Sequence, residues 1–274
     1  MAQRHSRAGN VDVDGHPALL QHRHPLAMVY GGGGVVGIAY TAGVAAGLVS
    51  VGLPVAGAPA LGTSAGSWTA SALALGLSYD DLADLPVPSV PSVRAGVLAE
   101  IARLVFGEST HPLVSVSAVT VRGRRRHILD GGVYPLADLV AASSAVPGLL
   151  PPHRIDGRLY VDGGMWSATS VDAAEEAARV IVVAPLAGRV MGPMGRVAGA
   201  LLERELDRWQ QRHSEASIHM IRPNREMSKI VGVRPLALFD AERARTIYPL
   251  AYEQGARWGE QIQAATPSER KAAG

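Results

Sequence analysis

A serine between two glycines is the residue in this sequence best suited to nucleophilic chemistry. Ser64 lies in the stretch Gly62-Thr63-Ser64-Ala65-Gly66, which fits the pattern G-x-S-x-G. Glycines at these positions allow a sharp turn between a strand and a helix, and the turn presents the serine hydroxyl at the amino end of the helix. Backbone amides at that end favour developing negative charge. An apolar segment precedes the pattern and an alanine-rich segment follows it, so the context predicts a nucleophilic serine.

A run of glycines upstream of Ser64 allows two interpretations. Gly31 to Gly34 are consecutive glycines and Gly37 follows them, a spacing that also fits the dinucleotide pattern G-x-G-x-x-G. That pattern expects an acidic residue about 20 positions further on to hold the ribose, yet no Asp or Glu occurs between Asp14 and Asp80. The alternative is an oxyanion hole, in which exposed backbone N–H groups stabilise a tetrahedral intermediate by about 2.7–4 kcal/mol per donor. The missing acid favours the oxyanion hole.

A nucleophilic serine needs a base, and the sequence offers several. Asp130 and Asp162 each precede two glycines, and Asp162 also follows an apolar segment that predicts the end of a strand. His213 or His219 would allow the order Ser-Asp-His, although neither lies in a glycine-bounded loop. Spacing alone leaves both aspartates open.

Taken together, these motifs resemble those of the patatin-like phospholipases. The glycine run at 32–37, the Ser64 motif and Asp162-Gly163-Gly164 occur in the family's order. A fourth segment, Ala142-Ser143-Ser144-Ala145-Val146-Pro147, is similar to the family's Ala-Ser-x-Ala-x-Pro segment ahead of its catalytic Asp-Gly-Gly. The resemblance covers roughly residues 26–185.

The resemblance implies a role for each motif. Ser64 would be the nucleophile and Asp162 its partner in a Ser-Asp dyad without histidine, because the fourth segment selects Asp162 over Asp130. The oxyanion hole would be formed by backbone amides of Gly32, Gly33, Gly34 and Val35. The implied fold is a three-layer α/β/α sandwich with a mainly parallel sheet, and the implied activity is hydrolysis of acyl esters of phospholipids or neutral lipids without metal or cofactor.

One position departs from the family pattern. Val36 stands where the family usually carries Arg or Lys. The backbone donors survive this change, but a positive charge is lost. The alternative hypothesis is therefore a weakly active or inactive lipid-binding protein with the same fold.

The elements that must position these residues follow from hydrophobic patterning. Apolar and alternating segments predict strands, whereas longer helical patterns predict helices between them, and this alternation is typical of an α/β fold with a largely parallel sheet. The expected strands are 26–30, 55–61, 113–121, 127–129 and 180–184. The expected helices are 37–50, 65–77, 173–179 (capped by Asp172), 196–213 and 240–263.

Residues 25–265 are expected to form one domain, preceded by a polar leader (1–24) and followed by a tail (266–274). Histidines and aspartates in the leader lack a metal-ligand spacing. The segment 35–53 is long enough to cross a bilayer, but its glycine, alanine and hydroxyl residues lower its hydrophobicity. We therefore expect a helix buried against a sheet.

Composition narrows the possible partners and location. Of 274 residues, 47% are hydrophobic and 18% charged, as in a globular protein, and a net charge of +2 gives no support for nucleic-acid binding. The absence of cysteine excludes thiolate chemistry and favours a cytoplasmic location. The arginine cluster at 122–126 predicts either a solvated hairpin turn or peripheral contact with lipid phosphates. Trp68 and Trp166, each near a catalytic candidate, could line an acyl pocket.

Overall fold

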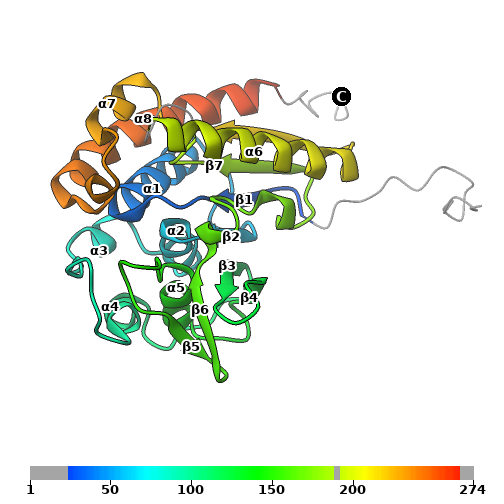
Figure 1. The fold of residues 1–274 in the computed structure, drawn as a ribbon. Coiled ribbons are helices and arrows are strands. Elements are labelled where there is room, and N and C mark those ends of the chain that lie inside the picture. The colour runs from blue at the N-terminus through cyan, green and yellow to red at the C-terminus, as the bar shows by residue number, and fades with distance from the viewer. Residues whose placement is uncertain (1–23, 188–191, 266–274) are drawn as a thin grey trace, which may run out of the picture.

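A mixed eight-stranded sheet forms the centre of the molecule. The computed structural model describes residues 24–187 and 192–265 (Figure 1). Hydrogen-bonded neighbours in the sheet run β5-β6-β3-β2-β1-β7-β8, and β4 also pairs with β3. The strands are β1 (Ala27–Tyr30), β2 (Ala60–Thr63), β3 (Val114–Thr120), β4 (Arg126–Asp130), β5 (His153–Ile155), β6 (Arg158–Asp162), β7 (Arg179–Val183) and β8 (Ser217–Ile221). Strands β3, β2, β1, β7 and β8 are parallel, whereas β4, β5 and β6 run antiparallel to their neighbours.

Helices cover both faces of this sheet. They are α1 (Gly34–Ser50), α2 (Ala65–Ala74), α3 (Asp80–Ala83), α4 (Val97–Phe106), α5 (Leu136–Ser143), α6 (Pro193–Arg212), α7 (Arg225–Val231) and α8 (Ala241–Ala265). Successive side chains of β1 point to opposite faces of the sheet, so the sheet separates two hydrophobic clusters. Met28 packs in the cluster that includes residues of α1, α2, α4, α5 and α8, whereas Val29 packs in the cluster that includes residues of α6. Figure 1 shows α6 on one side of the sheet and α1 with α8 on the other. The three-layer α/β/α fold is confirmed.

The apolar segment at 35–53, which is long enough to cross a bilayer, forms most of the buried helix α1. Helix α1 packs on α8, and glycines at the crossing allow the backbones to touch: a Cβ at Gly43 would lie 2.7 Å from the carbonyl oxygen of Tyr248. At Gly47 a Cβ would overlap the Tyr252 carbonyl oxygen. Within the described ranges, no helix combines the length and apolar character needed to cross a membrane.

Several expected boundaries are wrong. The strand predicted at 55–61 begins only at Ala60 because Pro59, which lacks an N–H, is preceded by tight turns, among them Ala58 N–H to Val55 O. The helix predicted at 65–77 ends at Ala74, and that predicted to begin at residue 37 begins at Gly34.

The helix predicted at 173–179 does not form. A single 3₁₀ turn, Val171–Ala173, occupies its start, and the chain then extends into β7. Asp172, the expected cap, instead forms a two-pronged ion pair with Arg126 at 2.6 and 2.7 Å. The elements α5, β5, β8 and α7 were not predicted.

Apart from His24, which forms an isolated parallel bridge with Ala177, the histidine-rich leader lies outside the described residues. Within the described part of the chain, no group of three or more His, Asp or Glu side chains is arranged to hold a metal ion.

Candidate active site

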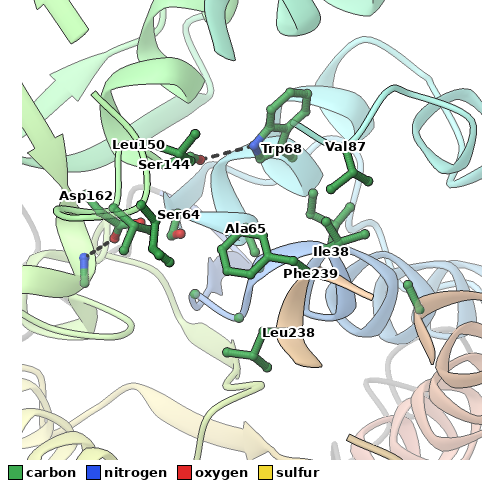
Figure 2. Close-up of a pocket in the computed structure, with 18 of the residues that line it drawn as sticks. Ile38, Ser64, Ala65, Trp68, Val87, Ser144, Leu150, Asp162, Leu238 and Phe239 are labelled. Atoms are coloured by element: carbon green, nitrogen blue, oxygen red, sulfur yellow. Dashed lines mark hydrogen bonds between the residues drawn. The ribbon is translucent and has the colours of Figure 1, made fainter. Parts of the chain in front are cut away.

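Ser64 and Asp162 meet because two strands share one edge of β3. Strand β4 pairs with β3 residues 115–119, so β2, which pairs with 114–117, and β6, which pairs with 118–120, both occupy the opposite edge. Thr63 pairs with Ser117 and Asp162 with the next residue, Ala118. The two strands therefore meet end to end, and the Ser64 side chain lies beside the Asp162 carboxylate (Figure 2).

The turn that carries Ser64 has the geometry of a nucleophile elbow. Ser64 has φ 52° and ψ −120°, a positive φ that is uncommon for a residue with a side chain. A Cβ at Gly62 would lie 2.5 Å from the Cα of Ser67, and one at Gly66 would overlap the carbonyl oxygen of Tyr30. Both glycines of the motif are therefore required by close backbone contact.

The segment at 142–147 holds both ends of the pair in place. The Ser64 N–H donates to Ser143 Oγ at 2.9 Å, and the Ser143 hydroxyl donates to the Ser117 carbonyl at 2.7 Å. Further along the segment, the Asp162 N–H donates to the Ala145 carbonyl at 3.0 Å. The sequence reasoning identified this segment but not Ser143 as the residue that fixes the elbow. A buried hydroxyl beside the strand ends is the signal that could have found it.

Asp162 is an unusually basic carboxylate. Its side chain is only 5% exposed, and burial raises its pKa from the ordinary 3.8 to about 6, although the Ser64 hydroxyl and the Gly164 N–H act in the opposite direction. The Gly164 N–H lies 2.6 Å from Oδ1. A carboxylate with this pKa can accept a proton near neutral pH.

The glycine run lies directly beside Ser64, and one of its expected donors is already used. A Cβ at Gly32 would be 3.3 Å from the Ser64 Cβ, but the Gly32 N–H donates to the Ala168 carbonyl at 2.8 Å. This bond corrects the expectation that Gly32 is an oxyanion donor. The first bond of α1 runs from the Gly37 N–H to the Gly33 carbonyl. The amides of Gly33, Gly34 and Val35 precede it, so they have no partner within the helix.

The other candidate bases lie elsewhere. Asp130 is exposed, pairs with Ser115 toward the start of β3 and accepts a hydrogen bond from the Gly132 N–H. His213 packs against Trp209, and His219 lies within β8 opposite Ile181. None of the three lines the cavity that contains Ser64.

That cavity is large and apolar. It has a volume of about 430 Å³, and Asp162 is the only charged side chain among its described lining residues. Ser64, Asp162 and the amides of 33–35 lie at its wall, and Trp68 lines it with its indole N–H bonded to Ser144 Oγ at 3.1 Å (Figure 2). Its larger apolar lining residues include Ile38, Leu82, Leu85, Leu98, Ile101, Leu149, Leu150, Leu238 and Phe239. Trp166 does not line this cavity.

Val36, the departure from the family pattern, points away from the cavity. Its buried side chain belongs to the main core and lines a crevice of about 10 Å³ with Tyr40, Met227 and Ile247. A basic side chain with the same orientation would be buried among apolar groups, at considerable cost. Valine at this position is therefore explained by packing, and its side chain does not line the cavity that contains Ser64.

A strand–helix turn that carries a serine beside a buried carboxylate and next to the free amides of a helix is the arrangement of serine acyl hydrolases. Comparison with known proteins agrees with this class. Residues 91–175 match the family model described as "Patatin-like phospholipase", and this stretch contains Ser143 and Asp162.

The chain is also 31% identical over 170 residues to uncharacterized NTE family proteins of Mycobacterium bovis and Mycobacterium tuberculosis. The match covers 56% of this chain and 29% of each relative, so it spans less than a third of the relatives' length. The comparisons therefore show similarity to the patatin-like phospholipase family over residues 91–175.

Proposed function

We propose that this protein is a lipid acyl hydrolase that cleaves carboxylic esters through an acyl-Ser64 intermediate. The observation that carries this proposal is the placement of Ser64 beside a buried, basic Asp162 at the wall of an apolar cavity. A cavity of this size and character suits a hydrocarbon chain. Similarity of residues 91–175 to the patatin-like phospholipase family supports acyl-ester lipids as the substrate class.

The chemistry proceeds in two steps. Asp162 takes the proton from Ser64 Oγ as the oxygen attacks the ester carbonyl, and the amides of Gly33, Gly34 and Val35 stabilise the oxyanion. Asp162 then returns the proton to the departing alcohol oxygen, leaving acyl-Ser64. In the second step Asp162 removes a proton from water, the hydroxide oxygen attacks the acyl carbon, and Ser64 leaves protonated with release of the fatty acid.

The dinucleotide alternative has little support in the fold. A ribose-binding acid would stand at the carboxyl end of the strand after the glycine loop. That strand is β2, and its carboxyl end carries Thr63 and Ser64.

Peripheral contact with a membrane also belongs to this proposal. Arg122, Arg124 and Arg125 are exposed on the turn between β3 and β4, and in the described structure none of them forms an ion pair. Arg126, next in sequence, is paired with Asp172. We likewise propose that residues 25–265 form one domain, supported by the single sheet running from β1 to β8.

The proposal is tested by hydrolysis of a panel of acyl esters, including phospholipids, acylglycerols and a soluble chromogenic ester. We expect the wild type to release fatty acid from at least one class, and Ser64→Ala to lose this activity while retaining its fold by circular dichroism. Lipid binding without hydrolysis in either protein would instead support the lipid-binding alternative.

A further inference from the structure

A second hollow adjoins the cavity on the Asp162 side. It has a volume of about 400 Å³. Gly164, Ala168 and Ala198 line both spaces, and the Gly164 N–H is the group bonded to the Asp162 carboxylate. The hollow therefore begins beside the reacting groups but extends away from the main cavity.

One face of α6 makes the hollow apolar. Val197, Ala198, Leu201 and Leu202 line it, and residues spaced by four along a helix share a face. Val197 is 62% exposed and Leu201 49% exposed, and across the hollow Trp166 is 54% exposed. A group of large apolar side chains that are exposed together is typical of a binding surface.

The wall formed by Trp166 is held in position. The Arg126 guanidinium lies 5.5 Å from the centre of the Trp166 ring and is fixed by its two bonds to Asp172. A cation over an indole face is attracted to it. The hollow is thus preformed, which reduces the entropy lost on binding.

Polar groups at the hollow are already used within the protein. The Ser167 hydroxyl donates to Glu205 at 2.7 Å and the Thr169 hydroxyl to the same carboxylate oxygen at 3.4 Å. None of the described lining residues is a cation, and neighbouring Arg126 is neutralised by Asp172. A phosphate head group would find no free positive partner among these residues, so the chemistry favours a hydrocarbon chain.

We propose that this hollow holds the second hydrocarbon chain of a two-chain lipid while the chain to be cleaved lies in the main cavity. This inference rests on the proposed function and narrows it: the preferred substrates are diacyl lipids rather than single-chain esters. Because the second chain would bury several additional methylene groups, we expect kcat/KM to be at least tenfold higher for a two-chain lipid than for a single-chain lipid.

The test compares diheptanoyl phosphatidylcholine with monoheptanoyl lysophosphatidylcholine, both below their critical micelle concentrations so that membrane adsorption plays no part. The double variant Val197→Gln/Leu201→Gln makes the exposed helix face polar. Leu104→Gln is the matched control, because Leu104 is 70% exposed on α4 and lines neither space.

We expect the double variant to lose tenfold or more in kcat/KM on the two-chain lipid and less than twofold on the single-chain lipid, with the control unchanged on both. Equal losses on both lipids, or no loss on the two-chain lipid, would overturn the second-chain site alone. Absence of hydrolysis of either lipid and of every other acyl ester by the wild type would overturn the proposed function and this inference with it.

Discussion

At the scale of single residues, the chemistry depends on keeping Asp162 both buried and ionisable. Its surroundings are apolar enough to raise its pKa to about 6, while the Ser64 hydroxyl and the Gly164 N–H prevent a larger increase. A base with a pKa near the working pH combines a usable fraction of the ionised form with a strong tendency to take a proton. In the proposed mechanism, this buried carboxylate takes the place of the histidine of a triad.

Activity should follow the ionisation of Asp162. We expect kcat/KM to rise about tenfold per pH unit below pH 6 and to level off above it, since only the carboxylate form accepts the serine proton. Asp162→Asn should lower kcat by about 10²–10⁴ at pH 8. Initial rates with a soluble ester between pH 4.5 and 9 measure both effects. A loss of comparable size in His213→Ala or His219→Ala would instead indicate a triad.

Stability should show the opposite pH dependence. Because the pKa of Asp162 is higher in the folded protein, the folded state binds its proton more tightly, so this group's contribution to stability is full below pH 4 and is lost as pH rises to about 6. The change from 3.8 to about 6 corresponds to roughly 3 kcal/mol. Asp162→Asn should thus raise the free energy of unfolding at pH 8, by urea denaturation, and lose that advantage at pH 4. An equal difference at both pH values would contradict this explanation.

At the scale of elements, the site depends on where α1 begins and on what holds it. Its first turn supplies the free amides beside Ser64, and its body is fixed to α8 by glycine contacts, including Gly255, whose Cβ would overlap the Val44 carbonyl oxygen. Packing of these two helices thus determines the position of the expected oxyanion hole.

Filling this helix crossing should therefore reduce both stability and activity. Gly47→Ala would place a methyl group against the Tyr252 carbonyl oxygen, and we expect a loss of about 1–3 kcal/mol in the free energy of unfolding, as for other overpacked sites. Gly57→Ala is the matched control, because nothing lies within 4 Å of its would-be Cβ. Urea denaturation and ester hydrolysis should show lower stability and lower activity for Gly47→Ala than for Gly57→Ala. Equal stability would show that the crossing tolerates the added methyl group.

The sequence predicted the local part of this arrangement better than the long-range part. Alternating valines revealed β3, and the apolar run before Gly31 revealed β1, because these signals lie within a few neighbouring residues. The end-to-end meeting of β2 and β6 on β3 depends on pairing across about 100 residues, which local patterns do not encode. Asp172 was misread because an N-cap and an ion-pair partner have the same residue type.

The candidate site could likewise be predicted in part. The glycines around Ser64 and the two glycines after Asp162 indicate tight turns, so they identify Ser64 and Asp162 as candidates. The bond from the Gly32 N–H to Ala168, which removes one expected donor, joins segments far apart in sequence. Spacing alone could not reveal it.

At the scale of the whole molecule, the expected membrane contact rests on the unpaired arginines of the β3–β4 turn. Each arginine near an anionic surface contributes about 1 kcal/mol. Replacing Arg122, Arg124 and Arg125 together by Gln should weaken binding to vesicles containing phosphatidylserine about 100-fold, measured by co-sedimentation. Binding to neutral phosphatidylcholine vesicles is the control and should not change. Unaltered binding to the anionic vesicles would support the alternative, a solvated turn.

The most direct test of the central claim is covalent labelling of Ser64. The folded protein is treated with a fluorophosphonate, and the adduct is located by intact mass and peptide sequencing. We expect one adduct, on Ser64, that is absent in Ser64→Ala and forms much more slowly in Asp162→Asn. Turnover of an ester substrate without any adduct on Ser64 would contradict the proposed mechanism.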